Sequence, residues 1–178
     1  PCGFKSGIRP ARYDHVIVIM DENTSYGQVI GQPGSDAATA APFVTQLAAA
    51  CGLATNYHGI THPSHPNYMA ATSGVASVSG STSIASIFSQ VHSNGRTWRA
   101  YNESMPAPCQ HFTVLPYMVE HNPGVWYQPL GSTCAGSDLG GTALDHDLAT
   151  YAMPSLAFIT PDQCDNMHMA CTTGENRI

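Results

Sequence analysis

A serine stands between two prolines in residues 61–68, THPSHPNY. Pro63 and Pro66 fix φ at about −65° and remove two backbone donors, so the turn that carries Ser64 is stiff. The residues that follow, MAAT, are compatible with a helix. The N-terminus of such a helix offers free N–H groups and the positive end of the helix dipole. This position suits a nucleophile that attacks phosphate.

A second candidate segment is the apolar run 15–20, HVIVIM, which ends in Asp21, Glu22 and Asn23. The run predicts a buried parallel strand, and ligands bind beyond the carboxyl ends of such strands. Oxygen ligands in a row indicate a divalent cation. The alternative is that these side chains only cap the helix that follows.

Five motifs together resemble the phosphoesterase family of the alkaline-phosphatase superfamily. That family contains bacterial acid phosphatases, phosphatidylinositol-3-phosphatases and phospholipase C-type enzymes. The motifs occur in the family's order and span nearly the whole chain. They are residues 20–26 (MDENTSY), 58–68 (HGITHPSHPNY) with 72–74 (TSG), 103–106 (ESMP), 121–123 (HNP), and 158–162 (FITPD) with 167–168 (MH).

The resemblance implies roles for the residues of the first two motifs. Ser64 matches the nucleophile of the family, with Thr61 as the alternative. Glu22 and Asn23 match ligands of one divalent metal ion, and Ser64 Oγ would complete that side of its coordination sphere. The reaction would pass through a phosphoserine that water hydrolyses.

Further polar residues are expected around the phosphate. By the resemblance, His121 and His168 bind phosphate or protonate the leaving group. Glu103 follows the predicted strand 97–101, where a loop-stabilising role is an equal alternative. The predicted substrate-binding residues are Asn67, Glu103 and His62, the last of which has a scaffold role as its alternative.

Three departures from the family pattern affect these expectations. Relatives continue beyond the position of Ile178 into a strand whose acidic pair supplies the remaining metal ligands, so we expect the C-terminal part of the fold to be missing. The preferred explanation is truncation; a separate second chain and a protein that binds without turnover are the alternatives. Met169 stands where an acidic residue is expected, and His65 stands where relatives carry an apolar residue.

The alternation of predicted elements favours an α/β fold with a parallel sheet, and the resemblance implies a sandwich of the alkaline-phosphatase-like type. All 178 residues are assigned to one domain. A loop-rich insertion is predicted at 104–142, and its aromatic residues either line a substrate rim or fill the insertion's own core. The predicted strands are 15–20, 53–57, 97–101 and 156–160, and the predicted helices are 40–50, 66–73 and 81–91.

Six cysteines and few lysines favour disulfides and an oxidising compartment, hence a secreted protein. Zinc–thiolate binding would need a Cys-x-x-Cys spacing that the sequence lacks. Counting leaves about 15 pairings open. The simplest local arrangement joins Cys2 to Cys51, Cys109 to Cys134, and Cys164 to Cys171.

The net charge of −6 argues against a nucleic-acid partner, and no apolar run approaches the ~20 residues of a membrane span. The leading hypothesis is a secreted acid phosphatase or phosphatidylinositol-phosphate phosphatase, whose substrate is a phosphorylated small molecule or a phosphoinositide. The alternatives are a phospholipase C-type phosphodiesterase and a non-catalytic extracellular binding protein or inactive fragment.

Overall fold

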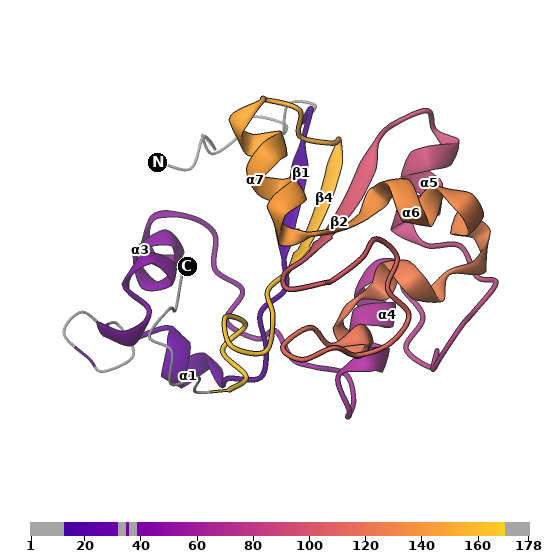
Figure 1. The fold of residues 1–178 in the computed structure, drawn as a ribbon. Helices are drawn as coiled ribbons and strands as arrows, with labels where there is room; N and C mark the ends of the chain where they lie inside the picture. The colour runs from indigo at the N-terminus through magenta and orange to yellow at the C-terminus, as the bar shows by residue number, and fades with distance from the viewer. Residues whose placement is uncertain (1–12, 32–34, 36–38, 170–178) are drawn as a thin grey trace.

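The computed structural model describes residues 13–31, 35 and 39–169. Its centre is a four-stranded sheet in the order β1-β4-β2-β3 (Figure 1). The strands are β1 (Val16–Ile19), β2 (Trp98–Asn102), β3 (Asp138–Gly140) and β4 (Leu156–Thr160), and every pair is parallel. The predicted α/β class with a parallel sheet is therefore confirmed.

The described helices flank this sheet. In Figure 1, α1, α3 and α7 lie to the left of the strands and α4, α5 and α6 lie to the right; α7 contacts β2 and β3. Short 3₁₀ segments η1 (Val119–His121), η2 (Pro123–Trp126) and η3 (Gln128–Thr133) connect β2 to β3 together with α6. The helices are α1 (Tyr26–Val29), α3 (Pro42–Ala50), α4 (His65–Ser73), α5 (Ile87–Ser93), α6 (Cys134–Ser137) and α7 (Gly141–Ala149).

The main core lies between the two central strands and the helices α4 and α5. β2 and β4 bury almost all their side chains, because each has a strand on both sides and helices against it. Helix α4 has a proline in its first turn and ends at Gly74, whose φ of 76° is the left-handed conformation that glycine adopts readily. The core residues are Tyr68, Met69, Phe88, Trp98, Ala100, Tyr127, Leu130, Leu156 and Phe158.

The position of β1 corrects one expectation. The strand forms and is parallel, but it is not buried: Val16, Ile17 and Ile19 are exposed. Within the described residues β1 pairs with β4 alone and is therefore an edge strand. A continuous apolar run does not by itself fix where in the sheet a strand lies.

One further element was predicted wrongly, and one predicted helix starts later than expected. Residues 53–57 are irregular, and Leu53 and Tyr57 are exposed rather than paired with a strand. The helix predicted at 81–91 begins only at Ile87, because Ser86 and Ser89 form a capping box there. The helices predicted at 40–50 and 66–73 are confirmed within two residues at each end.

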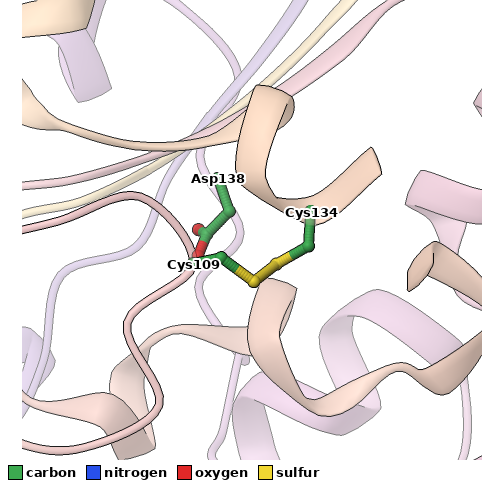
Figure 2. A group of neighbouring side chains, drawn as sticks. All are labelled: Cys109, Cys134 and Asp138. Carbon is green, nitrogen blue, oxygen red and sulfur yellow. A yellow bond between two sulfur atoms is a disulfide. The ribbon is translucent and has the colours of Figure 1, made fainter. Parts of the chain in front are cut away.

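The segment 104–142 is rich in 3₁₀ turns and is tied by the Cys109–Cys134 disulfide, which confirms that predicted pair (Figure 2). Of its aromatic side chains, Tyr117 is buried in the insertion's own core, as one alternative predicted, whereas Tyr127 is buried in the main core. Its last residues differ from a loop: Asp138 begins β3, which pairs with β2.

Cys51 and Cys164 are also disulfide-bonded. The partners predicted for them, Cys2 and Cys171, lie outside the described residues. No helix in the described part of the chain has the length and apolar character needed to cross a bilayer.

Candidate active site

The loops after β1 and β4 meet because the two strands are parallel neighbours. Glu22 N–H donates to Asn166 O at 2.9 Å, and Thr24 Oγ1 donates to Met167 O at 2.7 Å. The buried Asn166 side chain accepts a hydrogen bond from His168 N–H at 2.8 Å. These contacts bring the carboxylate after β1 and the histidine after β4 to the same edge of the sheet.

Ser64 lies at the N-cap of α4, as predicted, and a neighbouring amide braces its loop. Asn67 Oδ1 accepts hydrogen bonds from Ile60 N–H at 2.8 Å and Thr61 N–H at 3.3 Å. Its Nδ2 donates to the carbonyls of Thr61, Pro63 and Ser64. In this geometry the amide of Asn67 braces the loop that carries Ser64, and its predicted contact with substrate stays a prediction.

Three predicted site residues approach the same carboxylate oxygen, Glu22 Oε1. Ser64 Oγ donates to it at 3.0 Å, and His121 Nε2 lies 3.0 Å away. His168 Nε2 lies at 3.6 Å. Burial acts to raise the pKa of Glu22, but the hydrogen bond and charge of His121, with help from Ser64 and His168, outweigh it and hold this pKa below its usual value. The carboxylate therefore carries its negative charge among three predicted site residues.

His121 belongs to η1 and is fixed from two directions. Its ring stacks on that of Tyr68 from α4, with centroids 5.1 Å apart and planes 9° from parallel. Thr160, the last residue of β4, donates from Oγ1 to His121 O at 3.3 Å. The His121 side chain is almost fully buried, whereas that of His168 is one-third exposed (33%).

A cavity of about 890 Å³ opens in front of this group. The carboxylate and amide after β1 and the residues of the nucleophile turn form its wall, and partial burial of the Asp21 carboxyl group raises its pKa to about 6. The predicted residues on this wall are Glu22, Asn23, Thr61, His62, Ser64, Asn67 and His168. His121 stands behind Glu22 and is not part of the wall.

The residues around this cavity fit a divalent cation in their chemistry. Glu22, Asn23 and Ser64 supply a carboxylate, an amide and a hydroxyl to one cavity. Hard cations prefer oxygen ligands of this kind.

One predicted substrate-binding residue, Glu103, lies away from the cavity wall. Glu103 accepts a hydrogen bond from Asp162 N–H at 3.1 Å and clusters with Asp162 and Asp165 at the ends of β2 and β4. Burial and the carboxylates of Asp165 and Asp162 raise its pKa against that hydrogen bond. Glu103 is absent from the cavity wall, and this placement favours its loop-stabilising alternative.

His65 turns away from the cavity. Its Nε2 accepts a hydrogen bond from Gly80 N–H at 3.1 Å, and its ring packs edge-on against Trp126. Burial lowers its pKa. The histidine at this unusual position is therefore a scaffold residue.

Sequence reasoning did not single out Tyr68, which lines the cavity and holds the His121 ring. Its spacing from Ser64 is the signal that could have found it. The two residues are four positions apart at the start of a predicted helix, so they share one helix face.

The chain belongs to the Phosphoesterase family, whose model matches residues 34–177. It is similar to an acid phosphatase of Aspergillus fumigatus, with 30% identity over 133 residues, which cover 65% of this chain and 30% of that protein. A phosphatidylinositol-3-phosphatase of Mycobacterium tuberculosis is 26% identical over 165 residues, covering 88% of this chain and 52% of the relative. A phosphate-repressible acid phosphatase of Penicillium chrysogenum is 26% identical over 181 residues, which cover 92% of this chain and 41% of the relative.

The chain thus spans between about a third and a half of the length of these relatives. No solved structure matched it significantly. The family membership agrees with the resemblance that the five sequence motifs carry.

Proposed function

We propose that this chain carries the nucleophile half of a secreted phosphoric-ester hydrolase that works through a phosphoserine on Ser64. The observation that carries the proposal is the contact of Ser64 Oγ with Glu22 Oε1 at 3.0 Å, beside two histidines and an open cavity. The relatives named as acid phosphatases support a phosphomonoester as substrate. Disulfide bonding at Cys51, Cys109, Cys134 and Cys164 supports an oxidising compartment.

In the first step Ser64 Oγ attacks phosphorus, its hydroxyl proton passes to Glu22 Oε1, an O–P bond forms, and the bond to the leaving alcohol breaks. Glu22 holds the Ser64 hydroxyl so that its lone pairs point toward the cavity. His168 lines the cavity and is the better placed of the two histidines to protonate the leaving oxygen. Water then attacks the phosphoserine and releases inorganic phosphate and the free serine.

One divalent metal ion is part of the proposal. Glu22, Asn23 and Ser64 would hold it, and when bound it would lower the pKa of the serine hydroxyl and neutralise phosphate charge. Chelation followed by re-addition of single cations tests this directly. Activity that survives exhaustive chelation would exclude the metal while leaving the serine mechanism open.

The substrate class is proposed from the cavity wall and one relative. Tyr57 and Ile60 line the cavity and are 76% and 54% exposed. Apolar side chains at the mouth suit a leaving group with an apolar part, and the M. tuberculosis relative is named a phosphatidylinositol-3-phosphatase. Phosphoinositides are therefore candidates beside small phosphomonoesters. Relative activity on an aryl phosphate, a phosphoinositide and phosphatidylcholine separates a monoesterase from a phospholipase C.

The decisive experiment compares Ser64→Ala with Ser93→Ala, which removes an exposed hydroxyl at the end of α5. The expected result is loss of aryl-phosphate hydrolysis in Ser64→Ala alone. Acid-quenched wild type should also carry one extra phosphoryl group on the peptide that contains residue 64. Full activity in Ser64→Ala would refute the mechanism, and loss of activity in Thr61→Ala instead would move the nucleophile there.

A further inference from the structure

Tyr68 is a buried tyrosine whose hydroxyl has no hydrogen-bond partner. The residue is only 1% exposed, yet it lines the same cavity as Ser64 and Glu22. Its ring is occupied by stacking on His121, which leaves the hydroxyl as the one group of this side chain without a role. The Glu22 carboxylate lies near that hydroxyl and acts on it through its charge and a side-chain contact, but the contact does not have hydrogen-bond geometry.

Other buried tyrosines in the described part of the chain satisfy their hydroxyls. Tyr101 donates to Asp147 Oδ2, Tyr117 donates to Gln110 O, and Tyr127 bonds to Thr72 Oγ1. Leaving a buried hydroxyl without a partner costs free energy, so such a group in a native protein calls for an explanation. Tyr68 is the exception among these tyrosines, and it lies beside the candidate nucleophile Ser64, where a bound ligand can supply a hydrogen-bond partner for its hydroxyl.

We propose that the Tyr68 hydroxyl donates a hydrogen bond to a non-bridging oxygen of the phosphoryl group bound in front of Ser64. The proposal rests on the proposed function. An un-ionised phenol is a donor that needs an acceptor, and Glu22 Oε1 already faces Ser64 Oγ and His121 Nε2. Because Tyr68 lines the cavity, the oxygens of a phosphoryl group bound there would supply that acceptor. Tyr68 lies in the first turn of α4, four residues after the N-cap Ser64, so the two residues lie on the same side of the start of this helix.

Two other roles make different predictions. If the hydroxyl only oriented Glu22, its removal would weaken the binding of a divalent cation as much as that of phosphate. If Tyr68 acted only through the stacking of its ring on His121, removal of the hydroxyl would change neither the binding of the cation nor that of phosphate. Tyr68→Phe separates these cases because it keeps the ring and its stacking.

The matched control is Tyr127→Phe, which removes a buried hydroxyl bonded to Thr72 and Met69 O in the core, outside the cavity wall. In each variant we would measure the competitive inhibition constant of inorganic phosphate, kcat and KM for an aryl phosphate, the affinity for the activating cation, and Tm. Hydrogen bonds to charged groups are among the stronger ones, so Tyr68→Phe should weaken phosphate inhibition by about 10- to 100-fold. Its cation affinity should be unchanged and its Tm should not fall.

Tyr127→Phe should show the reverse pattern, with a lower Tm and a normal inhibition constant. Unchanged phosphate inhibition in Tyr68→Phe, or a parallel loss of cation affinity, would overturn the inference while leaving the proposed function intact. A wild-type protein that neither hydrolyses the ester nor binds inorganic phosphate would overturn the proposed function and this inference together.

Discussion

Asp138 gives a quantitative prediction about pH and stability. The residue is fully buried at the start of β3, near the Cys109–Cys134 disulfide (Figure 2). Its carboxyl oxygens accept hydrogen bonds from Asn102 Nδ2 at 2.7 Å and Asn122 Nδ2 at 2.9 Å. Burial nevertheless dominates and raises the pKa of Asp138 from 3.8 to about 7.

The sign follows from proton binding. The folded protein holds a proton on Asp138 that the unfolded chain releases above its ordinary pKa of 3.8. The stability from this proton is fully present below about pH 4 and is lost as the pH rises through about 7. A pKa difference of about three pH units corresponds to about 4 kcal/mol.

Asp138→Asn removes this titration. The difference between the unfolding free energies, variant minus wild type, should therefore increase by up to about 4 kcal/mol between pH 4 and pH 8. The new amide also places an N–H₂ group against the donors of Asn102 or Asn122, at a cost of ~1–3 kcal/mol that does not depend on pH. The test is therefore the change with pH and not the offset at one pH.

The assay is urea denaturation of wild type, Asp138→Asn and the control Asp145→Asn at intervals between pH 4 and pH 8. Asp145 is exposed on α7, so its variant should follow the wild-type pH dependence. Parallel curves for wild type and Asp138→Asn would refute the reasoning, because they would mean that the buried carboxyl titrates alike in both states.

Three further variants test the scaffold of the site. Replacing both Cys109 and Cys134 by alanine opens a link across a sequence separation of 25 and should lower the unfolding free energy by about 3 kcal/mol in urea denaturation. Asn67→Ala should lower both Tm and kcat, because the carbonyl and N–H groups of the nucleophile loop lose their partner; a loss of kcat with an unchanged Tm would contradict this bracing role. Because the pKa of Glu22 is lowered, its negative charge stabilises the fold above its ordinary pKa of 4.5, and this stability is lost in acid. The Tm of Glu22→Gln should therefore fall less steeply than that of the wild type as the pH is lowered. The variant should also bind the cation more weakly.

The sequence predicted those parts of the molecule whose physical causes are local. The two prolines around Ser64 begin α4 within one residue of the expected start, and the predicted strand 156–160 coincides with β4. Glu22 was placed near the site because it follows an apolar strand, and this inference needed only the polarity of parallel sheets. Local chemistry therefore located the turn that carries Ser64 and the carboxylate of Glu22.

Sequence reasoning failed where the outcome depends on distant partners. Residues 53–57 have the composition of a strand but no neighbouring strand to pair with in the described part of the chain. β3 is three residues long and is surrounded by glycine and short turns, so it carries no periodic signal. His121 was selected only through the family resemblance, since nothing local to the 3₁₀ segment η1 indicates that its ring meets Glu22.

The geometry around Glu22 divides the work between the two histidines. One carboxylate oxygen offers two lone pairs, and Ser64 Oγ and His121 Nε2 already approach Glu22 Oε1 at 3.0 Å each. His168 Nε2 at 3.6 Å is beyond hydrogen-bond length, and its side chain is one-third exposed (33%) on the cavity wall. We therefore interpret the buried His121 as the residue that fixes the carboxylate and His168 as the one that remains available to a substrate. His168→Asn should on this argument reduce kcat more for poor leaving groups than for good ones, whereas His121→Asn should reduce activity to a similar extent for both.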